Sequence, residues 1–101
     1  MAIVYQSSSI DWRAGTSTLN AQLANINTFI DSNKLLAWDI ENEFIAGIFN
    51  DAQSGTTQLK GFKAESDANV TAWIQSLNSP TQLVKMVLVE DFVLIEYTPN
   101  V

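Results

Sequence analysis

The stretch EDFVLIEY, Glu90–Tyr97, decides the fold, because NEFIAGIF at Asn42–Phe49 has the same pattern of apolar residues. Phe92 follows Phe44 at an offset of 48 residues, and the apolar residues around the two match at that offset. Each stretch begins with two polar residues, and another apolar run precedes them. Two apolar runs separated by two polar residues are typical of a β-hairpin. The sequence therefore predicts two hairpins of the same design.

A helical pattern precedes each hairpin. Apolar residues recur at helical spacing over residues 17–32 and again over residues 67–77, where Pro80 prevents continuation of the second helix. Together with the hairpins, these patterns predict two helix–strand–strand units, at residues 16–50 and 66–98. The likeness between them has two explanations, an internal duplication or a chance similarity of apolar spacing, and the sequence leaves both open.

The chain of 101 residues predicts one domain, residues 1–101, of the α+β class. Its predicted element order is β-α-β-β-β-α-β-β, with two helices and a mostly antiparallel sheet. The expected strands cover residues 3–6, 35–41, 44–50, 56–64, 83–89 and 92–97.

The turns fix which side chains share a face of each hairpin. In the last hairpin one face carries no charge, and we expect it to lie under the helices as core. Its members are Val84, Met86, Leu88, Val93, Ile95 and Tyr97. The same rule nominates, in the first hairpin, the pairs Ile40–Ile45, Trp38–Gly47 and Leu36–Phe49.

The opposite face of the last hairpin is also apolar, with Val87, Val89, Phe92 and Leu94. If both helices cover one side of the sheet, these four residues form an exposed patch, and a homodimer interface is its simplest explanation. The alternative is a sheet that curls on itself or carries one helix on each face. The four residues would then be ordinary core.

The net charge of −6 argues against nucleic acid as a partner, because the five bases are scattered along the chain. The chain has no cysteine and no histidine, so neither a thiolate site nor a histidine base or ligand is possible. We find no phosphate-binding loop either. The sequence predicts no catalytic residue, no metal site and no cofactor.

The carboxylates of Asp39, Glu41 and Glu43 follow at a spacing of two and could hold a divalent cation on one continuous strand. The turn at Asn42 breaks that geometry, so solvated charge is the better interpretation. If both turns lie at one edge, these residues and Glu90-Asp91 of the second turn would form an acidic rim that could steer a basic protein surface. Ordinary solubilising charge is the explanation that we favour.

Trp12 and Arg13 stand together in the segment before the first helix, and Arg13 is the only arginine. Both residue types are enriched in binding hot spots, so the pair is a candidate partner-binding site. The competing interpretation, which we favour, is that Trp12 packs on the helix start while Arg13 lies at the surface.

The first residues lack the pattern of a signal peptide, and no apolar run is long enough to span a membrane, so we expect a cytoplasmic protein. The predicted function is non-enzymatic: a small acidic binding module, a homodimer, which acts on another protein as adaptor or inhibitor. The alternative is a small-molecule-binding protein with a ligand cleft between the two repeat halves. An enzyme that uses carboxylates alone is the third hypothesis.

Overall fold

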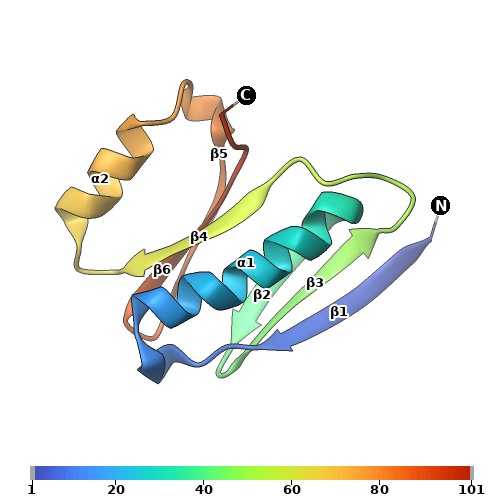
Figure 1. Ribbon diagram of the computed structural model, residues 1–101, viewed down its shortest axis with the longest axis horizontal. Coiled ribbons are helices and arrows are strands. Elements are labelled where there is room, and N and C mark those ends of the chain that lie inside the picture. Colours follow the sequence, from blue (N-terminus) through green and yellow to red (C-terminus); the bar gives the residue numbers. More distant parts are fainter. Residues whose placement is uncertain (1, 101) are drawn as a thin grey trace.

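The computed structural model describes residues 2–100, which form six strands, two α-helices and two short 3₁₀ helices (Figure 1). The α+β class and the predicted order of strands and helices are confirmed. The 3₁₀ helices lie in segments for which the sequence predicts no element. In chain order the elements are β1 (Ile3–Ser9), η1 (Trp12–Ala14), α1 (Thr16–Ser32), β2 (Lys34–Glu41), β3 (Phe44–Asn50), β4 (Gln58–Lys63), α2 (Asp67–Gln75), η2 (Pro80–Gln82), β5 (Leu83–Val89) and β6 (Phe92–Tyr97).

The strands form two antiparallel sheets of three strands each. The first sheet has the order β1-β3-β2 and the second has the order β4-β6-β5. Each half of the chain is therefore a strand, a helix and a hairpin, with the last strand in the middle of its sheet. We call Ile3–Asn50 the first unit and Gln58–Tyr97 the second unit. The common topology agrees with a repeat, whereas an origin by duplication stays a prediction.

Both hairpins contain the same local irregularities at an offset of 48 residues. Asn42 and Glu90, the first residues of the two turns, have φ values of 53° and 52°. Such left-handed φ values are uncommon outside glycine and suit tight hairpin turns. Each hairpin also contains one unpaired residue near its open end, Leu36 in β2 and Val84 in β5.

The predicted registers hold from the turns to these bulges. Ile40 pairs with Ile45 and Trp38 with Gly47, as expected from the two-residue turn. Beyond the bulge the pairing moves by one residue, so Phe49 lies opposite Leu35 instead of Leu36. The second hairpin behaves in the same way, since Tyr97 lies opposite Leu83 instead of Val84.

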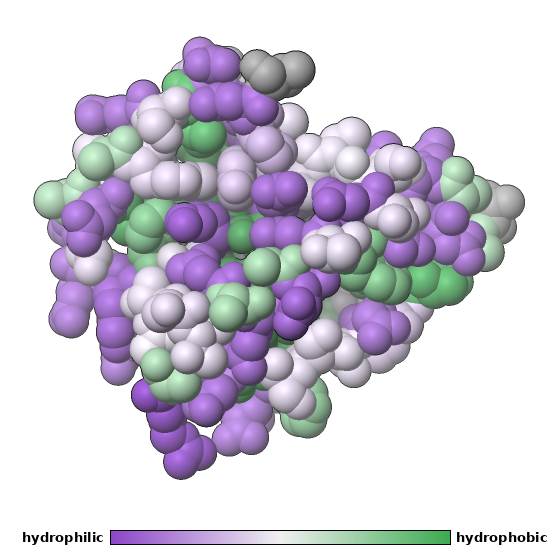
Figure 2. Space-filling view, viewed as in Figure 1, coloured by the Kyte–Doolittle hydropathy of each residue, from purple (hydrophilic) through white to green (hydrophobic). Residues whose placement is uncertain are grey.

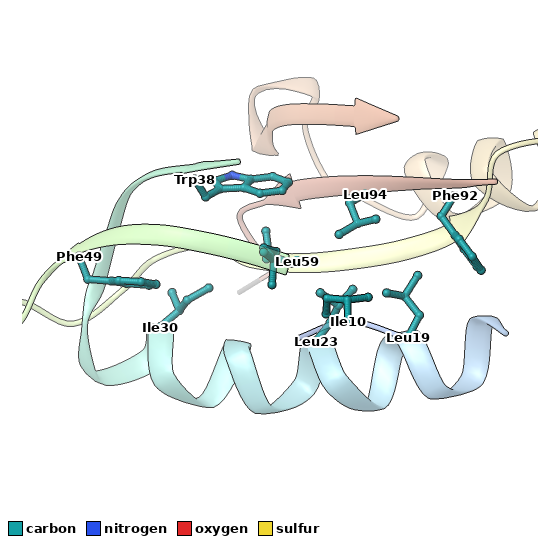
Figure 3. Packing of buried hydrophobic residues seen from close by; sticks show 10 residues of the cluster. Ile10, Leu19, Leu23, Ile30, Trp38, Phe49, Leu59, Phe92 and Leu94 are labelled. Atoms are coloured by element: carbon teal, nitrogen blue, oxygen red, sulfur yellow. The ribbon is translucent and has the colours of Figure 1, made fainter. Parts of the chain in front are cut away.

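One hydrophobic core joins the two units, and α1 forms one side of it. Figure 3 shows Leu19, Leu23 and Ile30 of α1 pointing toward Leu59 and Leu94 of the second sheet. Gly61, which pairs with Leu94, permits this contact, because a Cβ atom there would lie 2.6 Å from Leu19 Cδ2. The helix of the first unit therefore packs against the second unit as well as its own sheet.

This core overturns the expected exposure of the last hairpin. Phe92 and Leu94 are 1% and 0% exposed, and Val87 and Val89 are half-buried against the same cluster. The expectation that these four residues form an open patch is wrong. The physical reason is the alternative that the sequence left open: α1 covers one face of the second sheet and α2 lies over the other.

The face that was expected to be core is only half covered. On β6, Val93 and Ile95 are buried, whereas Val84, Met86 and Leu88 on the neighbouring β5 are exposed. The nine-residue α2 contacts this face through Trp73, whose ring meets those of Phe62 and Tyr97. A helix this short leaves β5 uncovered, so the predicted core position of its apolar residues is wrong.

Two asparagines attach α1 to the free edge of β4. The carboxamide of Asn20 donates to the carbonyl of Gly61 (2.9 Å) and accepts from its backbone N–H (3.0 Å). Asn27 forms the same pair of bonds with Leu59, at 3.1 and 2.8 Å. Seven residues make about two helical turns, which brings both asparagines to one side of α1. These two asparagine clamps satisfy backbone groups of an edge strand that would otherwise lie open.

Candidate functional site

The apolar side chains of β5 are the first candidate site. Leu83, Val84, Met86 and Leu88 have exposed fractions of 37%, 54%, 63% and 68%, and we call them the β5 strip. Within the described chain, β5 pairs only with β6, so its other edge has no neighbouring strand. Exposed apolar residues gathered on one edge strand mark a surface that a partner can cover.

The first unit shows how unusual this strip is. Met86 occupies the position of Trp38 at the offset of 48 residues, but Trp38 is only 6% exposed. The difference follows from what covers each sheet. The 17-residue α1 and the second sheet enclose Trp38, whereas the 9-residue α2 does not reach Met86. The second unit therefore lacks the cover that its counterpart has.

The outer face of the first sheet is exposed too, but its chemistry is mixed. Ile3, Tyr5, Phe44 and Ile48 are all more than two-fifths exposed, with Ser7, Asp39 and Glu41 among them. Charged and hydroxyl side chains among the apolar ones are typical of a sheet face that meets water. Figure 2 shows green, hydrophobic surface in separate areas among purple residues on the side of the molecule that it presents.

Trp12 and Arg13 occupy one end of the molecule, beside both hairpin turns. The Trp12 indole N–H donates to the carbonyl of Asn42, and its ring centroid lies 5.7 Å from that of Phe92. Arg13 lies at the surface with its side chain 89% exposed, 3.4 Å from the carboxylate of Glu43. This geometry favours packing as the role of Trp12, and the partner-binding role of the pair stays a prediction.

The acidic residues of the two turns meet at this same end. Glu43 and Glu90 of the predicted acidic rim border one depression together with Asp11, whereas Asp39, Glu41 and Asp91 do not border it. Among residues 2–100, no three His, Cys, Asp or Glu side chains converge closely enough to hold a metal ion. Asp39, Glu41 and Glu43 therefore do not form the cation site that their spacing could have produced.

A buried carboxylate links the two sheets. Glu96 is 6% exposed, and its two oxygens accept 2.8 Å hydrogen bonds from the Trp38 indole N–H and the Thr57 hydroxyl. The ammonium of Lys85, opposite Glu96 in the ladder, lies 4.4 Å from the Trp38 ring centroid and donates to the Trp38 carbonyl. Both carboxylate oxygens accept hydrogen bonds from the protein, which is typical of a buried carboxylate with a structural role.

A cavity of about 400 Å³ lies between α1 and the first sheet. Trp38, Phe49, Ile30 and Leu59, labelled in Figure 3, form part of its apolar wall. Its polar side chains come from β1 and α1. They are Gln6, Ser8, Ser9, Gln22 and Asn25.

The sequence did not predict this cavity or its polar residues. The predicted ligand cleft lay between the two repeat halves, whereas nearly all the lining belongs to the first unit and only Leu59 comes from the second. The one signal in the sequence was Gly47 opposite Trp38, a small residue facing a large one. That pair indicated packing, and the space above it depends on where α1 lies.

Burial affects the ionisation of Tyr97, at the end of β6. Partial desolvation raises the pKa of Tyr97 above its ordinary value of 10.0. Tyr97 lies in the edge-to-face contact with Trp73, away from the cavity residues. The shift therefore reports on the packing of α2 and does not indicate acid–base chemistry.

Comparisons with protein-family models, with curated proteins and with solved structures found no match for this chain. In the described part of the chain, no helix is long and apolar enough to span a membrane.

Proposed function

We propose that this chain is a non-enzymatic, acidic binding module of the cytoplasm, which forms a homodimer and acts on another protein as an adaptor or inhibitor. The observation that carries the proposal is the β5 strip, with Met86 63% and Leu88 68% exposed on an edge strand. Burying such side chains is favourable by about 1.5 to 3 kcal/mol each, so an exposed group of them favours association.

The edge of β5 supports a second copy of the chain as the occupant. A strand edge carries free N–H and C=O groups, and an antiparallel copy of the same strand presents matching groups. With Met86 at the middle of β5, a two-fold axis through this residue would place the two strips side by side. The two second sheets would join into one continuous sheet.

Charge also favours a second copy at this strand. The chain has a net charge of −6, so two copies repel each other over most of their surfaces. β5 contains no acidic residue, and its one charged side chain, Lys85, contacts Trp38 within the same chain. Charge therefore opposes self-association less at β5 than on the acidic parts of the surface.

The acidic end of the molecule suggests what the dimer acts on. Glu43 and Glu90 border the same depression, and the single arginine there is already beside Glu43. Charge of this sign attracts a basic surface and accelerates encounter with it. We therefore propose a basic protein as the target of the module.

Native mass spectrometry of the wild-type chain and of Met86→Asp tests the proposal. We expect a wild-type dimer and a monomeric variant, because the new carboxylates would face each other across the two-fold axis. Met86 is already exposed, so the variant should keep its fold, which circular dichroism would verify. The matched control is Tyr5→Asp, at a position 70% exposed on the first sheet, and it should remain dimeric. A monomeric wild type, or a dimer in all three proteins, would contradict the proposed interface.

A further inference from the structure

We propose that the cavity under α1 is a binding site for an uncharged small molecule with an apolar body and an edge that forms hydrogen bonds with carboxamides. The inference goes beyond the dimer, since it concerns another surface and another class of ligand. It rests on the volume of the cavity, the absence of charge in its lining and the unused polar groups on its rim.

The volume and the inner wall favour an apolar body. The cavity measures about 400 Å³, which lies within the range of sites that hold small organic molecules. Ile30, Trp38, Phe49 and Leu59 line it and are each at most 6% exposed. Because this wall is already shielded from water, an apolar ligand seated there would gain mainly by removing its own hydrophobic surface from water.

Gly47 keeps part of this space open. It lies in β3 between Gln6 of β1 and Trp38 of β2, and it belongs to the cavity lining. A Cβ atom at this position would lie 2.9 Å from the ring of Phe49 and 3.1 Å from Leu35 Cδ1. Any larger residue would displace these two lining side chains, so the glycine preserves the shape of the cavity.

The lining excludes a charged ligand. The residues that border the cavity include aromatic, aliphatic, amide and hydroxyl side chains, and none of them is charged. Glu96 and Lys85 contact Trp38, but neither borders the cavity. An ion placed inside would lose its water without gaining a counter-ion, which is costly. The ligand is therefore neutral.

The rim defines the polar edge of the ligand. Gln22 accepts a 3.1 Å hydrogen bond from the backbone N–H of Asp11, which orients its carboxamide and leaves the NH₂ group as a donor. Over residues 2–100, the side chains of Gln6, Ser8 and Asn25 form no hydrogen bond with the protein. Carboxamides both donate and accept, so they match an amide-like edge.

Titration with 2-naphthamide, followed by NMR of the glutamine and asparagine side-chain amides, tests the inference. We expect saturable shifts of the Gln6, Gln22 and Asn25 resonances. The matched probe is 2-naphthoate, which has nearly the same shape and one negative charge. It should bind at least about tenfold more weakly, equivalent to 1.4 kcal/mol. Absence of saturable shifts with 2-naphthamide, or equal binding of the two probes, would overturn the inference.

Two tryptophan variants locate the binding event. Asn25 is an exposed rim residue of α1, so Asn25→Trp should close the mouth and raise the Kd for 2-naphthamide about tenfold. Ala21 is exposed on the same helix and does not border the cavity, so Ala21→Trp should change the Kd less than about twofold. Equal Kd values in the two variants would show that the ligand binds elsewhere and overturn the inference. Met86→Asp should bind 2-naphthamide like the wild type, which separates this site from the dimer.

Discussion

Trp73 meets Tyr97 edge-on, with ring centroids 4.7 Å apart and ring planes at 89°. The first unit contains the same contact between Phe29 and Phe49, at 4.7 Å and 85°. The helix residues are 44 positions apart in sequence, and the strand residues are 48 apart, which is the offset at which the two hairpins match. One aromatic pair therefore fastens each helix to the last strand of its own unit.

We expect Trp73→Ala to release α2 from the second sheet. No residue of α2 is fully buried, and Trp73 attaches the helix to the sheet through its ring contacts with Phe62 and Tyr97. The free energy of unfolding should fall by about 2 to 3 kcal/mol, less than for a fully buried tryptophan. Urea denaturation measures the loss, and hydrogen exchange should show faster exchange in residues 67–75. Trp73→Phe, which keeps a ring at the site, should recover most of the stability.

The asparagine clamps predict a second stability effect. In the double variant Asn20→Ala/Asn27→Ala, the N–H and C=O groups of Leu59 and Gly61 lose their partners. Each unsatisfied group costs about 1 to 3 kcal/mol where water cannot replace the bond. We expect a lower urea midpoint and faster exchange of the Leu59 and Gly61 amide protons. Asn25→Ala, on the exposed rim of the same helix, is the control and should leave both unchanged.

Glu96 should be replaceable by glutamine but not by leucine. Glu96→Leu leaves the Trp38 indole N–H and the Thr57 hydroxyl without an acceptor, at a cost of about 1 to 3 kcal/mol for each group. Glu96→Gln retains one oxygen of similar position, so it should lose less stability. Urea denaturation of the two variants gives the comparison. A leucine variant as stable as the wild type would show that the link between the sheets contributes nothing.

Tyr97 should titrate above pH 10 in the folded protein, because burial opposes ionisation of its phenol and raises its pKa. The chain has two tyrosines, so Tyr5→Phe leaves Tyr97 as the only phenol that ultraviolet absorbance reports. The unfolded chain ionises first as the pH rises. Stability from this group is therefore complete below pH 10 and is lost as the pH rises through the folded-state pKa. A midpoint at or below 10 would contradict the packing of α2 on this ring.

The hairpins were predictable from sequence, because two polar residues between apolar runs fix the pairing and alternation fixes the faces. Trp38 opposite Gly47 was correct for this reason. The prediction that only one face of β6 lies in the core was wrong, because Phe92, Val93, Leu94 and Ile95 are all buried. A central strand covered on both faces contains apolar residues at every position, so its sequence cannot show which face meets which helix.

The candidate sites depended on information that local patterns do not contain. The β5 strip is exposed because α2 has nine residues and α1 has seventeen, although both helices have suitable apolar spacing. The cavity depends on the position of α1, which is drawn toward β4 by Asn20 and Asn27. Polar residues at helical spacing of seven were visible in the sequence, but their acceptors lie 32 and 41 residues away.

The two asparagine clamps also determine what a cut in the chain would do. Residues 51–54 lie in the connection between the units and are exposed, so a protease can reach them. The helix of the N-terminal fragment is nevertheless bound to a strand of the C-terminal fragment. A nicked molecule should therefore migrate as one particle under native conditions and separate into two pieces only in denaturant. The two halves of this protein are therefore complementary fragments of one folded domain, and neither half is an independent module.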